Sequence, residues 1–109
     1  MNLEVTQLAE NMIMSMHDVL SEQWPQVREY AEAEARKLAE TLTMLERLKE
    51  LEKIDNEVAG IHLDIQKNAC RTALLAVDGL TIVAVEATLN AALDIVKAPV
   101  NCALESELI

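Results

Sequence analysis

Three polar side chains at heptad spacing are the strongest candidates for chemistry in this sequence. Glu34, Asp55 and His62 belong to one series with the members Val27, Glu34, Thr41, Leu48, Asp55 and His62. Carboxylate and imidazole groups on facing helices are the ligands with which helical bundles hold iron or manganese. The usual Glu-x-x-His signature is absent, because Glu57 and His62 are five residues apart. A metal site formed by Glu34, Asp55 and His62 would therefore be shared between copies of an oligomer. Alternatively, Asp55 and His62 flank a turn and Glu34 faces solvent.

A second group of candidates is apolar and consists of Trp24, Leu104, Leu108 and Ile109. Helix periodicity explains these residues least, since Trp24 precedes Pro25 at a predicted corner and the others lie near the end of the chain. Trp is enriched at protein interfaces, and an apolar terminus can dock into a partner's groove. The four residues are therefore the predicted partner-binding residues. The alternative is that they cap the ends of the molecule's own core.

The composition narrows the classes of function. No nucleophile motif, phosphate-binding loop, dinucleotide fingerprint or zinc-ligand spacing occurs, and the chain has only two glycines. The formal net charge is −10, with 19 acidic and nine basic residues, which disfavours binding to nucleic acid or to an anionic membrane. The uncharged runs are too short to predict a membrane span. An acidic chain does suit a basic protein partner.

The elements that position these residues are predicted to be helices. Residues 26–58 lack Gly and Pro and consist almost wholly of strong helix formers, which predicts a helix of about 30 residues, roughly 45 Å long. Residues 3–22 show the apolar spacing of an amphipathic helix, with Asn2 as its expected N-cap. Very few Gly and Pro residues occur, and this excludes a turn-rich β fold. The predicted class is all-α, an antiparallel helical bundle.

Two possible turns leave two arrangements open. Asp55, Asn56 and Gly60 favour a turn within 55–61, although an apolar series keeps its phase across it: Leu51, Ile54, Val58, Ile61 and Ile65. Gly79 and Thr81 suit a turn at 78–81, with Thr81 capping the next helix. With both turns, the helices lie near 3–22, 26–55, 58–78 and 81–98. Without them, a short first helix packs on a long hairpin of 26–58 and 62–98.

The last part of the chain sets the domain boundary and the predicted assembly. Pro99 is expected to end the last helix, which divides the chain into one domain, 1–98, and a C-terminal tail, 99–109. The apolar face of residues 62–98 exceeds what one short helix can cover. We therefore expect oligomerisation to complete the bundle, most simply as a two-fold homodimer.

Location and function follow from the same features. Residues 1–7 show no export signal, and Cys70 and Cys102 fit free thiols, so the expected compartment is the cytoplasm. The sequence favours a non-catalytic, acidic interaction protein without a cofactor: an adaptor, a small chaperone or an inhibitor of a protein partner. The alternative is a ferritin-like carboxylate and histidine bundle that binds iron or manganese for oxidation or storage.

Overall fold

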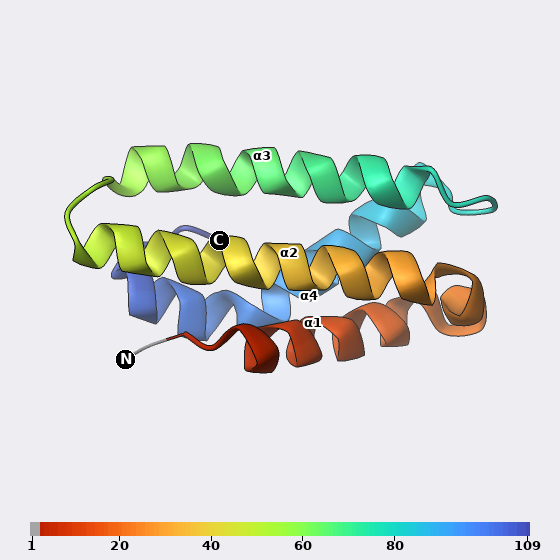
Figure 1. Cartoon of the computed structure of the whole chain (residues 1–109). Helices are drawn as coiled ribbons and strands as arrows, with labels where there is room; N and C mark the ends of the chain where they lie inside the picture. The colour runs from red at the N-terminus through yellow and green to blue at the C-terminus, as the bar shows by residue number, and fades with distance from the viewer. Residues whose placement is uncertain (1–2) are drawn as a thin grey trace.

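The computed structural model describes residues 3–109, and its ordered elements are all helices (Figure 1). In chain order they are α1 (Val5–Leu20), a short 3₁₀ helix η1 (Ser21–Gln23), α2 (Trp24–Glu50), α3 (Asn56–Leu75) and α4 (Ile82–Leu104). Helices account for 83 % of the described residues, and these contain no strand. The predicted all-α class is therefore confirmed. Asn2 lies outside the described residues, and Glu4 occupies the N-cap position of α1.

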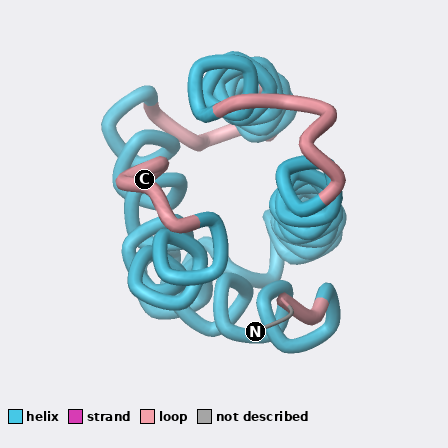
Figure 2. The backbone as a smooth tube through the Cα atoms, turned by 90° about the vertical axis from the view of Figure 1, so that its left-hand side faces the viewer, coloured by secondary structure: helices cyan, strands magenta, loops and turns pink. Residues whose placement is uncertain are grey.

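The helices form an elongated bundle with extents of 43 × 22 × 19 Å. α1 packs against α2 and α4, whereas α3 packs mainly against α2 and less extensively against α4. In Figure 1, α3 lies along the upper edge and α4 crosses behind α2; the end-on view in Figure 2 also places α3 at the edge. One long side of α3 therefore has none of the other helices against it.

The core consists of aliphatic, alanine and methionine side chains. Small residues on α2 let neighbouring helices approach closely. The fully buried residues of α2 include Ala31, Ala35, Leu38, Ala39, Leu42 and Leu45, and those of α1 include Met12 and Met16. No helix in the described part of the chain is long and apolar enough to cross a membrane.

The turn between α2 and α3 lies earlier than predicted, at residues 51–55. Glu52 takes the left-handed conformation (φ 55°) that Gly usually takes at a helix end. The Lys53 amide donates to the Leu48 carbonyl at 2.9 Å, which closes α2. Asp55 then caps α3 by accepting from the Val58 amide at 2.9 Å. Gly60 lies inside α3, so its predicted role in a turn is wrong.

The turn between α3 and α4 contains Gly79 and Thr81 as predicted, but α3 already ends at Leu75, before the predicted boundary at 78. Gly79 has a φ of 89°, a conformation that residues with a Cβ rarely adopt. The Thr81 hydroxyl caps α4 by accepting from the Ala84 amide at 3.1 Å.

The prediction that Pro99 ends the last helix is wrong. α4 continues through Pro99 to Leu104 and ends where Glu105 turns left-handed (φ 52°). Proline removes one helical hydrogen bond, but Val100 and Leu104 beyond it are buried, and their packing holds the helix together. The division into a domain, 1–98, and a tail, 99–109, stays a prediction.

Candidate functional site

The three predicted metal ligands do not come together within one chain. Glu34 is buried, contrary to the solvent-facing alternative, and accepts from the Lys37 ammonium at 3.1 Å. Asp55 is engaged in capping α3, and His62 lies half-buried on α3. Within residues 3–109, no group of three His, Cys, Asp or Glu side chains is arranged to hold a metal ion.

The predicted partner-binding residues near the C-terminus contact the chain's own core. Leu104 is 2 % exposed, and Lys49 donates to its carbonyl oxygen. Leu108 and Ile109 pack partly against the core. The Ile109 amide donates to the Asn101 side chain at 3.0 Å, so the end of the chain folds back on α4. These contacts agree with the capping alternative.

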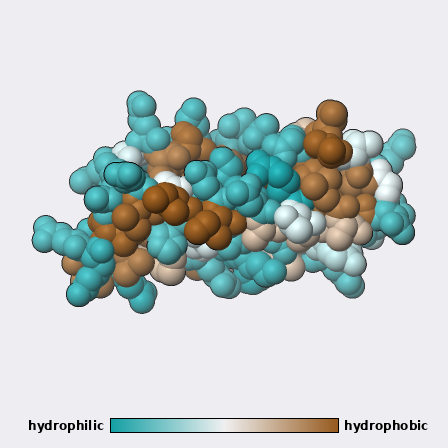
Figure 3. Space-filling view, turned by 90° about the horizontal axis from the view of Figure 1, so that it is seen from above, coloured by the Kyte–Doolittle hydropathy of each residue, from teal (hydrophilic) through white to brown (hydrophobic). Residues whose placement is uncertain are grey.

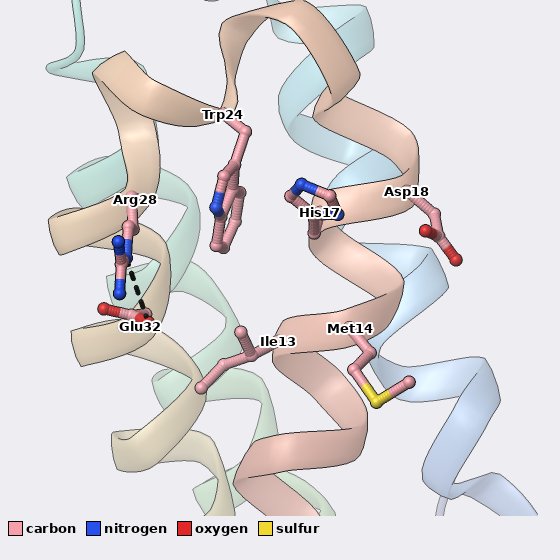
Figure 4. Close-up of a pocket in the computed structure, with 7 residues that line it drawn as sticks. All are labelled: Ile13, Met14, His17, Asp18, Trp24, Arg28 and Glu32. Atoms are coloured by element: carbon pink, nitrogen blue, oxygen red, sulfur yellow. Dashed lines mark hydrogen bonds and ion pairs between the residues drawn. The ribbon is translucent and has the colours of Figure 1, made fainter.

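The fourth predicted partner-binding residue, Trp24, lines a surface hollow of about 300 Å³ where α1 and α2 meet (Figure 4). Trp24 is the first residue of α2, and the His17 ring meets its indole edge-on at a centroid distance of 5.0 Å. Arg28 and Glu32 form an ion pair at 3.4 Å on the α2 side. The lining residues are Ile13, Met14, His17, Asp18, Trp24, Arg28 and Glu32.

The hollow combines an apolar surface with charged groups of both signs. Figure 4 shows Ile13 and the Trp24 ring directed into the space between α1 and α2, while Asp18 points away from it. An aromatic ring with a polar edge is a common anchor for another protein's side chain. The arrangement therefore suits binding of an apolar or mixed side chain.

A bidentate ion pair fastens α3 to α4. Arg71 donates through Nη2 to Glu86 Oε1 at 3.1 Å and through Nε to Glu86 Oε2. The hydrogen bonds with Arg71 lower the pKa of the Glu86 carboxyl, and the same bonds raise the pKa of the Arg71 guanidinium. Arg71 also donates to the side chain of Asn68. The Arg71 guanidinium is thus held in place at the edge of α3.

The α3 helix is apolar on two opposite sides. One side is buried in the bundle and includes Ala59, Leu63, Cys70 and Leu74. On the other side, Ile61 is 54 %, Ile65 62 % and Leu75 42 % exposed. We call this second side the outer face of α3; its members are Val58, Ile61, Ile65, Asn68, Thr72 and Leu75, whereas Ile54 precedes the helix and packs against the core.

Figure 3 views the molecule from the side of α3 and shows two hydrophobic areas separated by polar side chains. One area lies over the first half of α3, and the other lies where α3 ends and α4 begins. At the start of α4, Ile82 is 69 % and Val83 78 % exposed, which extends the second area. Exposed apolar patches of this kind commonly mark interaction sites.

The spacing of apolar residues in the sequence indicates the outer face of α3. The apolar series that keeps its phase from Leu51 to Ile65 continues the pattern of the long helix and resembles a core seam. A second apolar series, which includes Leu63, Cys70 and Leu74, runs on the opposite side of the same helix. Two opposed series on one helix predict that it is covered on both sides or has an exposed apolar side.

Comparisons with protein-family models, curated proteins and solved structures found no match for this chain. The function proposed below therefore depends on the chain's own surface and contacts.

Proposed function

We propose that the protein is a non-catalytic helical interaction protein that assembles through the outer face of α3. The observation that carries the proposal is that α3 is apolar on two opposite sides, and residues 3–109 cover only one of them. Complete burial of an Ile side chain contributes about 1.5–3 kcal/mol. A row of exposed Ile and Leu residues therefore favours association.

The proposed assembly is a homo-oligomer, most simply a two-fold dimer. α3 carries two acidic and two basic residues, so its formal charge is zero in a chain of net charge −10. Two identical acidic chains repel each other least where the local charge is balanced. The outer face of α3 is thus a surface on which two copies can meet at low electrostatic cost.

Assembly through α3 leaves the excess negative charge on the rest of the surface. That surface suits a protein partner with basic groups, as an adaptor, a small chaperone or an inhibitor would require. The hollow beside Trp24 offers an apolar anchor point for such a partner. Its position between α1 and α2 keeps it away from the outer face of α3.

A matched pair of substitutions tests the proposal. Ile65→Glu places a charge on the outer face of α3, and the control, Ile95→Glu, places the same charge at a 50 % exposed position on α4. We expect light scattering at micromolar concentration to give the unchanged chain twice its mass of 12.1 kDa. We expect Ile65→Glu to remove about 2.7 kcal/mol of the association free energy, which weakens the dimer roughly 100-fold. The Ile65→Glu chain should therefore be a monomer.

The control variant should remain a dimer. An unchanged chain that stays at 12.1 kDa, or a dimer that both substitutions leave intact, would contradict assembly through α3.

A further inference from the structure

Building on the proposed function, we infer that the outer face of α3 pairs in antiparallel orientation with α3 of a second copy. The residues of this face recur at alternating intervals of three and four, from Val58 to Leu75. That alternation is the heptad pattern with which two helices pack along a shared seam. Figures 1 and 2 agree that, within residues 3–109, no other helix lies along this side of α3.

The charges beside this face select the antiparallel orientation. Asp64 and Arg71 lie seven residues apart on the same flank of the face. In an antiparallel pair, equivalent flanks meet, which places Asp64 of one copy beside Arg71 of the other. The two-fold axis repeats this contact, so each dimer contains two opposite-charge pairs.

A parallel pair lacks these contacts. There, the flank with Asp64 and Arg71 meets the opposite flank of the second copy, which carries His62, Ala69 and Ala76. Asp64 and Arg71 then face Ala69 and Ala76, and the only acid that meets a basic side chain is Glu57, opposite His62. Charge complementarity along α3 therefore favours a second copy in the antiparallel orientation.

The same register matches the apolar residues. It sets Ile61 opposite Thr72 and Val58 opposite Leu75 of the second copy. It also places the hydrophobic area over the first half of α3 against the area at the α3–α4 turn of the other copy (Figure 3). Asn68 lies near the centre of the seam, where a polar residue commonly fixes register.

The Arg71 guanidinium is already oriented and partly exposed, as a contact between copies requires. Glu86 and Asn68 already orient its guanidinium, and its side chain remains 32 % exposed. A guanidinium has five N–H donors, so Arg71 can bind Asp64 of a second copy while it keeps its present partners. The orientation established within one chain lowers the entropy cost of the new contact.

Engineered disulfides test the register. The variant Ile61→Cys with Thr72→Cys is made in a Cys102→Ser background, which removes the exposed native thiol. The two positions are eleven residues apart on α3, a separation of about 16 Å along the helix. A disulfide requires Cα atoms about 4.4–6.8 Å apart, so the two thiols of one chain cannot pair. In the antiparallel register, each thiol faces its partner position in the second copy.

We expect the oxidised double variant to run as a covalent dimer without reductant, while each single variant runs as a monomer. A second pair, Val58→Cys with Leu75→Cys, should give the same result. Circular dichroism of the reduced variants checks that they keep their helix content.

Three other results would overturn the antiparallel pairing. Cross-linking of Ile61→Cys alone indicates a parallel pair. If neither double variant cross-links although Ile65→Glu still separates the copies, the face is correct and the register is wrong. An unchanged chain that is a monomer in light scattering would refute the proposed function as well.

Discussion

The two cysteines have opposite environments. Cys102 is exposed on α4, whereas Cys70 is fully buried on the side of α3 that faces the core. Burial raises the pKa of the Cys70 thiol from 9.0 to about 12, and the nearby Glu34 carboxylate adds to the shift. A protonated, buried thiol is a poor nucleophile, so Cys70 acts as a small apolar residue of the core.

The raised pKa of Cys70 predicts a loss of stability at high pH. The unfolded chain releases the thiol proton near pH 9, while the folded chain retains it up to about pH 12. The stabilising contribution is therefore complete below pH 9 and falls as the pH rises toward 12, with a slope of at most about 1.4 kcal/mol per pH unit. We expect Cys70→Ala to show a shallower decline in unfolding free energy over this range than the unchanged chain.

Denaturant titrations at several alkaline pH values measure this difference. Cys102→Ser is the control and should follow the unchanged chain. Parallel pH profiles for all three proteins would show that the Cys70 thiol is not protected by burial.

At the scale of helices and turns, Pro99 gives the clearest prediction. Proline is about 3 kcal/mol less favourable than Ala inside a helix, and Pro99 is an exposed residue within α4. Pro99→Ala restores a backbone donor without changing the core, so it should raise the free energy of unfolding by about 1–3 kcal/mol.

Thermal unfolding measures the effect, with Lys97→Ala as a control on the same exposed turn. The control should change stability by no more than about 0.5 kcal/mol. An unchanged melting temperature for Pro99→Ala would mean that α4 ends before Pro99 in solution.

Helix boundaries show what the sequence could predict. Asp55 and Thr81 were predictable caps because short polar side chains at a helix start bond its free amides. The end of α2 was not predictable in the same way, since Glu52 takes a conformation usually given to Gly. The continuation of α4 past Pro99 depends on the burial of Val100 and Leu104, which is a tertiary effect.

The candidate sites were predicted less completely, for a related reason. A heptad series placed Glu34, Asp55 and His62 on one line, but the turn at 51–55 separates α2 from α3 and assigns Asp55 to a cap. Sequence spacing also identified the apolar residues of α3 without showing which of its two sides the bundle would cover. That choice depends on how α3 packs against α2.

For the whole molecule, the central claim is that α3 is a shared surface. The bundle covers one side of α3, and we propose that a second copy covers the other. The distribution of charge is consistent with this arrangement, because α3 is neutral while the chain as a whole is strongly acidic. In the proposed antiparallel pair, the hydrophobic area over the first half of α3 in one copy lies against the hydrophobic area at the α3–α4 turn of the other copy.

The most direct measurement needs no substitution. Isotope-labelled and unlabelled chains are mixed, and an isotope-filtered NMR experiment detects only contacts between different copies. The account predicts contacts from Ile61 and Ile65 methyl groups to Thr72 and Asn68 of the other copy. An absence of contacts between copies at α3, at concentrations where light scattering finds a dimer, would contradict it.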